Sequence, residues 1–259
     1  MQRMRDILIA MSVMQKGDWD GIYRMLKDKV RLTDEEVQKA FTSVDSGCVT
    51  LIDDDYPEAF KEVFKPPLTI FYKGDINLLS SKKIVSCAGA RAATEYTAKK
   101  VSSLVGEALD VDSDMVLCSG MALGVDSIAL REAIMRNRKI IAVAGCGIDR
   151  CYPETSRDIY DYCVSGKGLI ISEYPLDVPP SRESFPFRNR LIAGLGKSLL
   201  AAQVGKRSGT STTIRCALDY GKTILVLPQR LEEGEVTAEL LRDGATPVLS
   251  GEDIARSIG

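Results

Sequence analysis

From Lys82 onward, short apolar runs alternate with amphipathic stretches. The apolar runs have the length and the Val/Ile/Leu content of buried parallel strands, which predicts strands at 83–88, 115–118, 139–144, 168–172, 198–203, 223–227 and 247–249. The amphipathic stretches have helical periodicity, which predicts helices at about 94–110, 124–137, 155–165, 212–221 and 235–243. This alternation is typical of an α/β fold: a Rossmann-like parallel sheet with right-handed crossovers and helices on both faces.

The first 44 residues have a helical pattern throughout. They predict one helix that ends near residue 16, a second over about 18–29 and a third that begins at Thr33. Thr33 precedes Glu36 by three residues, which is the spacing of a capping box. Three short helices would make a small appendage. It would either brace the main domain or act as a module that docks a partner or touches DNA.

Residues 45–80 have a different composition and read as a connector. A short helix is predicted to end near Phe64, because Pro66 and Pro67 cannot continue it, and a strand is predicted at 68–72. Three consecutive aspartates at 53–55 favour a solvated turn. The alternative is a metal site, but the side chains of three adjacent residues converge poorly on one ion.

The overall composition is that of a soluble globular protein with a slightly negative balance, 34 Lys and Arg against 36 Asp and Glu. It contains no apolar run of about eighteen residues that would predict a membrane span. The first twenty residues read as a helix rather than a signal peptide because Asp6 interrupts their apolar stretch, so we expect a cytoplasmic protein without a membrane partner. The seven cysteines are odd in number and favour reduced, buried thiols over disulfides.

The sequence contains no histidine. This excludes Ser-His-Asp and Cys-His nucleophile systems and histidine general bases, and it removes most zinc sites. Catalysis would have to rest on carboxylates, lysine or electrostatic stabilisation. The composition therefore favours a binding protein over an enzyme, and we expect no catalytic residue, metal or cofactor.

Residues 182–215 contrast with this neutral background. They contain one acid, Glu183, and seven basic residues: Arg182, Arg188, Arg190, Lys197, Lys206, Arg207 and Arg215. In this segment the strand at 198–203 leads into a loop rich in Gly, Ser and Thr and then into a helix. Such a loop favours an anion cradle, because glycine lets the backbone approach a ligand and the helix start donates free N–H groups. The alternative is a Ser/Thr-rich helix cap beside solvated lysines.

The turns that follow the predicted strands are unusually rich in glycine. Because ligands of open α/β sheets bind beyond the carboxyl ends of the strands, we expect these turns to converge: 88–94, 119–126, 145–149 and 208–213. No single turn is specific, and the one at 88–94 lacks the full G-x-G-x-x-G pattern, but together they predict a phosphate-binding surface. Cys87, Cys118 and Cys146 adjoin the turns and read as small strand residues, with a thiol nucleophile as the alternative.

Five motifs occur in order along the chain: Ser119-Gly120-Met-Ala-Leu-Gly124-Val-Asp126, Gly145-x-Gly147-x-Asp149-x-x-Tyr152-Pro153, Ser172-Glu173-Tyr174-Pro175, Phe185-Pro186-x-Arg188-Asn189-Arg190-Leu-Ile-Ala-Gly194 and Ser208-Gly209-Thr210. In this order they resemble the DNA-processing protein A (DprA/Smf) family over about residues 52–249. The Phe-Pro-x-Arg-Asn-Arg and Ser-Glu-Tyr-Pro elements are the most specific. The resemblance divides the chain into a helical, SAM-like appendage at 1–44, a connector at 45–80 and a Rossmann-like DprA/Smf domain at 81–259.

The resemblance implies a homodimeric protein that binds and protects incoming single-stranded DNA and loads a RecA-type recombinase during natural transformation. It also implies a phosphate-binding pocket lined by Arg91, Ser119, Gly120, Gly124, Arg182, Arg188, Asn189, Arg190, Ser208, Gly209, Thr210 and Thr212. Arginine suits this role because it contacts phosphate through two N–H groups and can lie flat on a base. Phe185, Phe187 and Tyr174 are candidate stacking partners, with core packing as the alternative.

The chain departs from the family pattern at several positions. It has Leu123 where the family usually has arginine, Leu130 for histidine, Gln203 for glutamate, Gln229 for glycine and Ala238 for asparagine. A missing basic group at position 123 would weaken DNA binding, and Lys206 and Arg207 would compensate beside the cradle. The sequence ends at Gly259, so we expect no C-terminal winged-helix domain of the kind found in many relatives.

The alternative function comes from a second resemblance. The LOG (lysine-decarboxylase-like) nucleotide phosphoribohydrolases are similar in fold and in glycine-rich turns, which would make this chain a nucleotide-binding protein or a phosphoribohydrolase. Those enzymes carry a catalytic glutamate after their Pro-Gly-Gly-x-Gly-Thr turn, whereas here no Glu lies between Glu183 and Glu232. A third possibility is a partner protein whose pocket binds a small nucleotide without turnover. We therefore expect a non-enzymatic DNA-binding protein.

Overall fold

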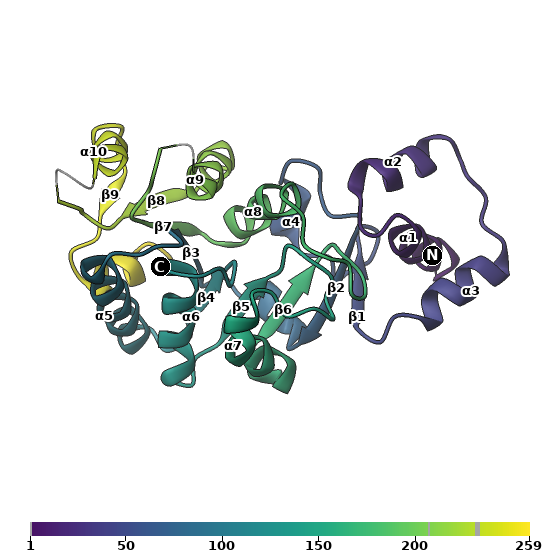
Figure 1. Cartoon of the computed structure of the whole chain (residues 1–259), viewed down its shortest axis with the longest axis horizontal. Coiled ribbons are helices and arrows are strands. Elements are labelled where there is room, and N and C mark those ends of the chain that lie inside the picture. Colours follow the sequence, from purple (N-terminus) through teal and green to yellow (C-terminus); the bar gives the residue numbers. More distant parts are fainter. Residues whose placement is uncertain (1, 207, 231–233) are drawn as a thin grey trace.

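The computed structural model describes residues 2–206, 208–230 and 234–259. Within them the strands form one sheet in the order β1-β2-β6-β5-β4-β3-β7-β8-β9 (Figure 1). The strands are β1 (Gly47–Thr50), β2 (Thr69–Gly74), β3 (Ile84–Gly89), β4 (Val116–Ser119), β5 (Ile140–Val143), β6 (Leu169–Ser172), β7 (Ser198–Ala202), β8 (Thr223–Val226) and β9 (Thr246–Pro247). All pairs from β6 to β9 are parallel, while β2 pairs antiparallel with both β1 and β6. The predicted Rossmann-like fold is confirmed.

Helices cover both faces of this sheet. They are α1 (Gln2–Met14), α2 (Trp19–Lys27), α3 (Asp34–Thr42), α4 (Glu58–Lys61), α5 (Glu95–Val111), α6 (Val125–Met135), α7 (Arg157–Tyr162), α8 (Ser184–Leu195), α9 (Gly209–Asp219), α10 (Glu235–Arg242) and α11 (Gly251–Arg256). Short helical turns lie at Ile76–Ser80, Glu154–Ser156 and Cys163–Lys167. In Figure 1 helices α4, α8, α9 and α10 lie on one side of the sheet and α5, α6 and α7 on the other.

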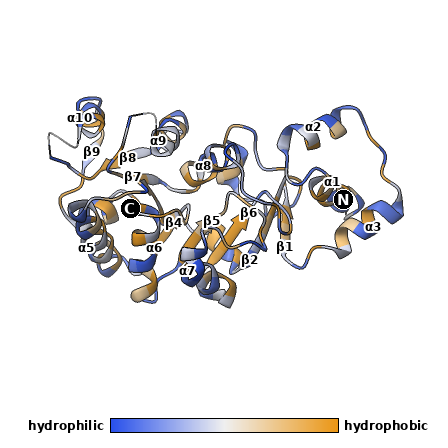
Figure 2. Cartoon of the chain, viewed as in Figure 1, coloured by the Kyte–Doolittle hydropathy of each residue, from blue (hydrophilic) through white to orange (hydrophobic). Residues whose placement is uncertain are grey.

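The continuous apolar runs follow from this layering. Successive side chains of a strand point to opposite faces, so a strand covered on both sides must be apolar at every position. In β3, Val85 belongs to the same buried cluster as Leu104 of α5, while Ile84 belongs to a second cluster with Leu191 and Leu195 of α8 on the opposite face. Figure 2 shows the resulting band of hydrophobic strands through the centre of the molecule.

The strand β1 and the helices α8 and α11 are not predicted from the sequence. β1 is a short edge strand held by cross-strand pairing, such as that of Cys48 with Phe71. α8 carries Arg188, Asn189 and Arg190 among its buried residues, so it lacks the polar outer face from which a helix is recognised in a sequence. α11 has six residues, too few to show a helical period. The sheet also extends through β1 and β2 into the segment that the sequence marks as a connector.

The N-terminal helices pack against this antiparallel end of the sheet. The capping box of α3 is confirmed, with the side chain of Thr33 accepting from the N–H of Glu36. Ile9 of α1 is buried in the same cluster as Phe71 of β2, and Nε1 of Trp19 donates to the Pro66 carbonyl at 2.8 Å. The appendage thus contacts the main domain through both core packing and the proline turn.

Other features expected from the composition can be located in the structure. The seven cysteines are free, and five of them are buried.

Asp53, the first of the three aspartates, accepts from Nε of Arg5 and from the N–H of Thr50, each at 2.9 Å, and so closes the turn after β1. Among the described residues no helix combines the length and the hydropathy needed to span a membrane.

Candidate functional site

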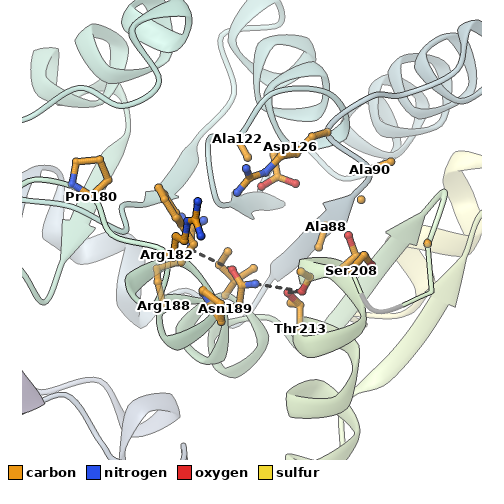
Figure 3. Close-up of a pocket in the computed structure, with 18 of the residues that line it drawn as sticks. Ala88, Ala90, Ala122, Asp126, Pro180, Arg182, Arg188, Asn189, Ser208 and Thr213 are labelled. Carbon is orange, nitrogen blue, oxygen red and sulfur yellow. Dashed lines mark hydrogen bonds between the residues drawn. The ribbon is translucent and has the colours of Figure 1, made fainter. Parts of the chain in front are cut away.

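The sheet has a topological switch point between β3 and β7. From β3 the strands run through β4 and β5 to β6, and the chain then returns over α8 to place β7 on the other side of β3. Ligands of open α/β sheets bind in the crevice that forms beyond the strand ends at such a point. A pocket of about 720 Å³ lies there (Figure 3).

Three of the four glycine-rich turns reach this pocket. Residues 88–91 after β3 line it, as do Gly205 and 208–210 around the start of α9, and Ala122 and Asp126 contribute from the turn after β4 and the start of α6. The turn after β5 supports the pocket from behind, because its Gly145 carbonyl accepts from Oγ of Ser184 at 2.6 Å. Three of the four predicted turns thus contribute lining residues, and the fourth contacts α8 through Gly145.

Glycine is required where two of these turns meet. A Cβ atom on Gly89 would lie 2.3 Å from the Ala202 carbonyl oxygen, and one on Gly124 would lie 2.2 Å from that of Ala90. Gly124 also has a φ of +78°, a conformation that side-chain-bearing residues rarely adopt. The two glycines let the backbones of three loops pack against one another without intervening side chains.

The start of α9 forms the second wall of the pocket. Oγ of Ser208 accepts from the N–H of Ser211 at 3.2 Å, and Nδ2 of Asn189 donates to the Gly209 carbonyl at 3.1 Å, which ties α9 to α8. Gly209 and Thr210 line the pocket. The first N–H groups of a helix lack intrahelical partners and carry the positive end of its dipole, so this wall suits an anion.

Two exposed cations stand at the pocket. Arg91 comes from the turn after β3, and Arg182 precedes α8; both line the pocket and both are exposed. The guanidinium carbon of Arg91 lies 5.5 Å from the ring centroid of Phe185. These arginines can approach a phosphate from solvent without first breaking a buried ion pair.

Arg188 forms the floor of the pocket and is only 4% exposed. Its Nη1 donates to the carbonyls of Gly120, at 2.9 Å, and of Val143. A Cβ on Gly120 would lie 2.7 Å from Nη2 of Arg188, so the guanidinium rests directly on this glycine. Burial lowers the pKa of Arg188, while the charge of Asp126 acts in the opposite direction. Part of its donor capacity is thus committed to the protein itself.

Asp126 places a carboxylate in the same pocket and is 7% exposed. Burial raises its pKa to about 6, and this effect outweighs the opposing influence of Arg188 and of backbone hydrogen bonds from Ala122, Gly120 and Gly89. Asp126 is not among the predicted site residues, although it lies in one of the quoted motifs. A carboxylate is unexpected in a pocket for anions, because it would repel a negatively charged ligand.

Arg190 points away from the pocket, toward the connector. Its Nη1 and Nη2 bind the two carboxylate oxygens of Glu173 at 2.6 and 2.7 Å, and its Nε donates to the Phe64 carbonyl at 2.8 Å. Arg190 is 2% exposed and Glu173 is 5% exposed. The two arginines of the Arg-Asn-Arg motif therefore serve different parts of the molecule.

The predicted site residues divide accordingly. The pocket lining includes Arg91, Arg182, Arg188, Asn189, Ser208, Gly209 and Thr210, and does not include Ser119, Gly120, Gly124, Arg190 and Thr212 among the described residues. Ser119 is buried and donates to the Cys87 carbonyl at 2.7 Å. Lys206 pairs with Glu235 at 2.6 Å, and Arg207 lies outside the described residues.

The aromatic candidates also separate. Phe185 lines the pocket and lies 5.6 Å, centroid to centroid, from Tyr152, a lining residue that is not among the predicted ones. Phe187 instead packs on the guanidinium of Arg190, 3.8 Å from its ring centroid, and Tyr174 is half-buried outside the pocket lining. Phe187 and Tyr174 thus follow the core-packing alternative in their placement.

Comparisons of sequence place this arrangement among known proteins. The model of the family described as DNA recombination-mediator protein A matches residues 47–259. DNA processing protein DprA of Streptococcus pneumoniae is 32% identical over 226 residues, which are 86% of this chain and 78% of that protein. Protein Smf of Escherichia coli strain K12 is 32% identical over 205 residues, 78% of this chain and 54% of that protein. The chain thus spans about half the length of this longer relative.

Comparisons of structure agree with those of sequence. The X-ray structure of DNA processing protein A from Streptococcus pneumoniae superposes with a TM-score of 0.79 at 28% identity, covering 97% of this chain and 92% of that one. The structure of DNA processing protein A from Helicobacter pylori, solved for its single-stranded DNA binding mode, gives a TM-score of 0.73 at 32% identity and covers 83% of this chain and 96% of that one.

Proposed function

Because this chain belongs to the DNA recombination-mediator protein A family, we propose that it binds single-stranded DNA through the pocket between β3 and β7. The observation that carries the proposal is the placement of exposed Arg91 and Arg182 around the N-terminal end of α9. Two exposed cations and a helix start give one phosphate of the strand several donors. The single-stranded DNA binding studied for the Helicobacter pylori relative supports the same ligand.

Within this proposal the predicted site residues have different roles. Arg91, Arg182, Ser208, Gly209 and Thr210 contact the phosphate, while Ser119, Gly120, Gly124, Arg188, Asn189 and Thr212 hold the walls in place. Arg190 instead joins α8 to Glu173 and the connector. Phe185 lies beside Arg91 and is available to stack with a base next to the bound phosphate. The pocket would then contact the DNA backbone and the flat face of a base. Neither contact depends on base identity, which suits binding without sequence preference.

The proposed cellular role follows from the same family. The protein would act in the cytoplasm as a homodimer, protect incoming DNA during natural transformation and load a RecA-type recombinase on it. This role needs no chemical step. Among the described residues that line the pocket Asp126 supplies the one carboxylate, and its neighbours are Arg188 and the backbone of the glycine turns. Incubation with nucleoside monophosphates is expected to release no base.

The direct experiment is fluorescence anisotropy of a labelled oligo-dT at a series of salt concentrations. The Arg91→Ala/Arg182→Ala variant is expected to bind more weakly and to show a smaller salt dependence, by about 0.7 in slope for each phosphate that it no longer neutralises. The matched control is Lys99→Ala/Lys100→Ala, which removes two exposed cations of α5 outside the pocket lining. Equal weakening in both variants would show that only the general charge of the surface matters, and the proposed site would be wrong.

A further inference from the structure

In this protein, side chains of the chain itself occupy the region where a Rossmann-like fold ordinarily binds phosphate. In such folds the pyrophosphate of a dinucleotide binds at the turn after the first parallel strand, against the start of the following helix. Here that helix is α5, and the N–H of Thr94 at its start donates to Oε1 of Gln203 at 2.7 Å. Nε2 of Gln203 donates to the Ala92 carbonyl at 3.1 Å. One side chain from the end of β7 therefore makes two hydrogen bonds to the backbone of this loop.

Three further backbone donors at these turns are used internally. The N–H of Ala90 donates to the Ala202 carbonyl at 3.3 Å, and the N–H of Val125 donates to the Ala90 carbonyl at 3.1 Å. The N–H of Thr97 in the first turn of α5 is bound by Oγ1 of Thr94 at 3.3 Å. These backbone donors at the turn after β3 and at the helix starts are therefore already paired within the protein.

Asp126 occupies the neighbouring position from the other side. Its Oδ2 lies 2.8 Å from the point that a Cβ of Gly120 would occupy, so the carboxylate rests on the backbone of the turn after β4. Backbone hydrogen bonds reach it from Ala122, Gly120 and Gly89, which belong to both glycine-rich turns. The charged or titratable groups that face it are Arg188 of α8 and the thiols of Cys87 and Cys118 in β3 and β4. The carboxylate of Asp126 thus lies between the two glycine-rich turns, where it would repel a second phosphate.

We propose that Asp126 and Gln203 are specificity-determining residues that close the pyrophosphate position, so that the pocket holds one phosphate of a phosphodiester chain and gains no affinity from a second, adjacent phosphate. The proposal rests on the DNA-binding function proposed above and narrows it to a ligand class. It leaves the start of α9 as the open anion position, with Arg91 and Arg182 beside it. A ligand with one phosphate per sugar can then use all the available donors, whereas a dinucleotide or nucleoside triphosphate meets the carboxylate.

The test is isothermal titration calorimetry of inorganic phosphate and pyrophosphate into the full chain at constant ionic strength. For the wild type, the two dissociation constants are expected to agree within about threefold. Asp126→Asn and Gln203→Ala are each expected to tighten pyrophosphate binding by about tenfold, the effect of one additional anion contact, while phosphate binding changes less. Anisotropy with oligo-dT is measured on the same samples.

Glu183→Gln is the matched control, because Glu183 is an exposed acid next to Arg182 and is not part of the pocket lining. It removes the same charge as Asp126→Asn and is expected to leave the preference between the two anions unchanged. Wild-type protein that binds pyrophosphate about tenfold more tightly than phosphate would overturn the proposal, as would folded variants that keep the wild-type preference. Should Asp126→Asn fail to fold, Gln203→Ala decides the question, since the side chain of Gln203 is only half-buried.

The two proposals fail in different ways. Wild-type protein that binds no oligo-dT would defeat the proposed function, whatever its response to small anions. Tighter pyrophosphate binding by both Asp126→Asn and Gln203→Ala would still support the role of these two residues in closing the pyrophosphate position. Normal oligo-dT binding with unchanged anion preference would leave the proposed function standing and overturn the role of Asp126 and Gln203.

Discussion

Two pairs of arginines that the sequence assigns to one pocket have opposite environments. Arg91 and Arg182 are exposed at the pocket, while Arg188 and Arg190 are 4% and 2% exposed and bind carbonyl and carboxylate oxygens of the protein. A buried guanidinium is stable only when its donors have partners, and removing a partner costs far more than at the surface. An arginine of these motifs can therefore either contact the ligand or hold elements of the protein together.

The largest effect is expected for the buried pair, at Arg190. Arg190→Ala leaves Glu173 as a buried carboxylate without its counter-ion, and the free energy of unfolding should fall by about 3–5 kcal/mol. Urea denaturation measures this decrease. The double variant Arg190→Met/Glu173→Gln removes both charges and should recover much of it. A decrease below about 1 kcal/mol for Arg190→Ala would contradict the structural role of this pair, because that is the range of surface pairs.

Asp126 is expected to give the next largest effect, through pH. Its pKa is raised from 3.8 to about 6 by burial, so the folded state binds its proton more tightly than the unfolded state does. The contribution of this group to stability is therefore fully present below pH 3.8 and is lost as the pH rises through about 6. The size of the change is about 3 kcal/mol for a shift of this order.

This pH effect is measured as the difference in unfolding free energy between wild type and Asp126→Asn on either side of the raised pKa. The wild type should lose stability relative to the variant as the pH rises through about 6. A difference that stays flat over this range would mean that Asp126 keeps an ordinary pKa and that its burial beside Arg188 does not control its protonation.

The exposed pair should affect binding and leave stability nearly unchanged. Arg91→Ala and Arg182→Ala are each expected to weaken oligo-dT binding by about tenfold, the value of a charge-assisted phosphate contact. Thermal unfolding of both variants should match the wild type, because neither side chain is buried. A large decrease in stability in either variant would erase the distinction between the two pairs.

The smallest effect is expected at Lys206. Glu235→Gln frees this exposed lysine from its ion pair and leaves it available beside the start of α9. DNA binding at low salt should tighten by no more than about twofold, because exposed ion pairs are weak and screened. Anisotropy at low and moderate salt measures the change. Weaker binding in this variant would show that Glu235 supports the pocket rather than competing for Lys206.

Much of the fold is predictable from the sequence because the two-sided burial of parallel strands leaves a plain signal. The runs around Val85 and Leu199 are apolar at nearly every position, and they form β3 and β7. α8 is different, since its buried residues include Arg188, Asn189 and Arg190, whose partners come from distant loops. Helical periodicity cannot reveal a helix whose interior face is polar.

The candidate site shows the same limit. The cradle around Ser208 and the gathering of glycine turns follow from local chemistry and strand order. The orientation of Arg190 toward Glu173 does not, because it depends on how the connector packs on α8. Gln203 appears in the sequence only as a departure from a family pattern, and its bonds to Thr94 and Ala92 become visible only when β7 lies beside β3.

The most direct test of the division between the two arginine pairs measures oligo-dT affinity and unfolding free energy together for Arg91→Ala/Arg182→Ala and for Arg190→Ala, at one salt concentration and with wild type alongside. We expect the first variant to lose most of its DNA affinity and to keep the wild-type stability. We expect Arg190→Ala to lose stability and, in the fraction that remains folded, to keep DNA affinity. The reverse result, with DNA binding abolished by the removal of Arg190 in folded protein and unaffected by the removal of Arg91 and Arg182, would contradict the assignment of the pocket.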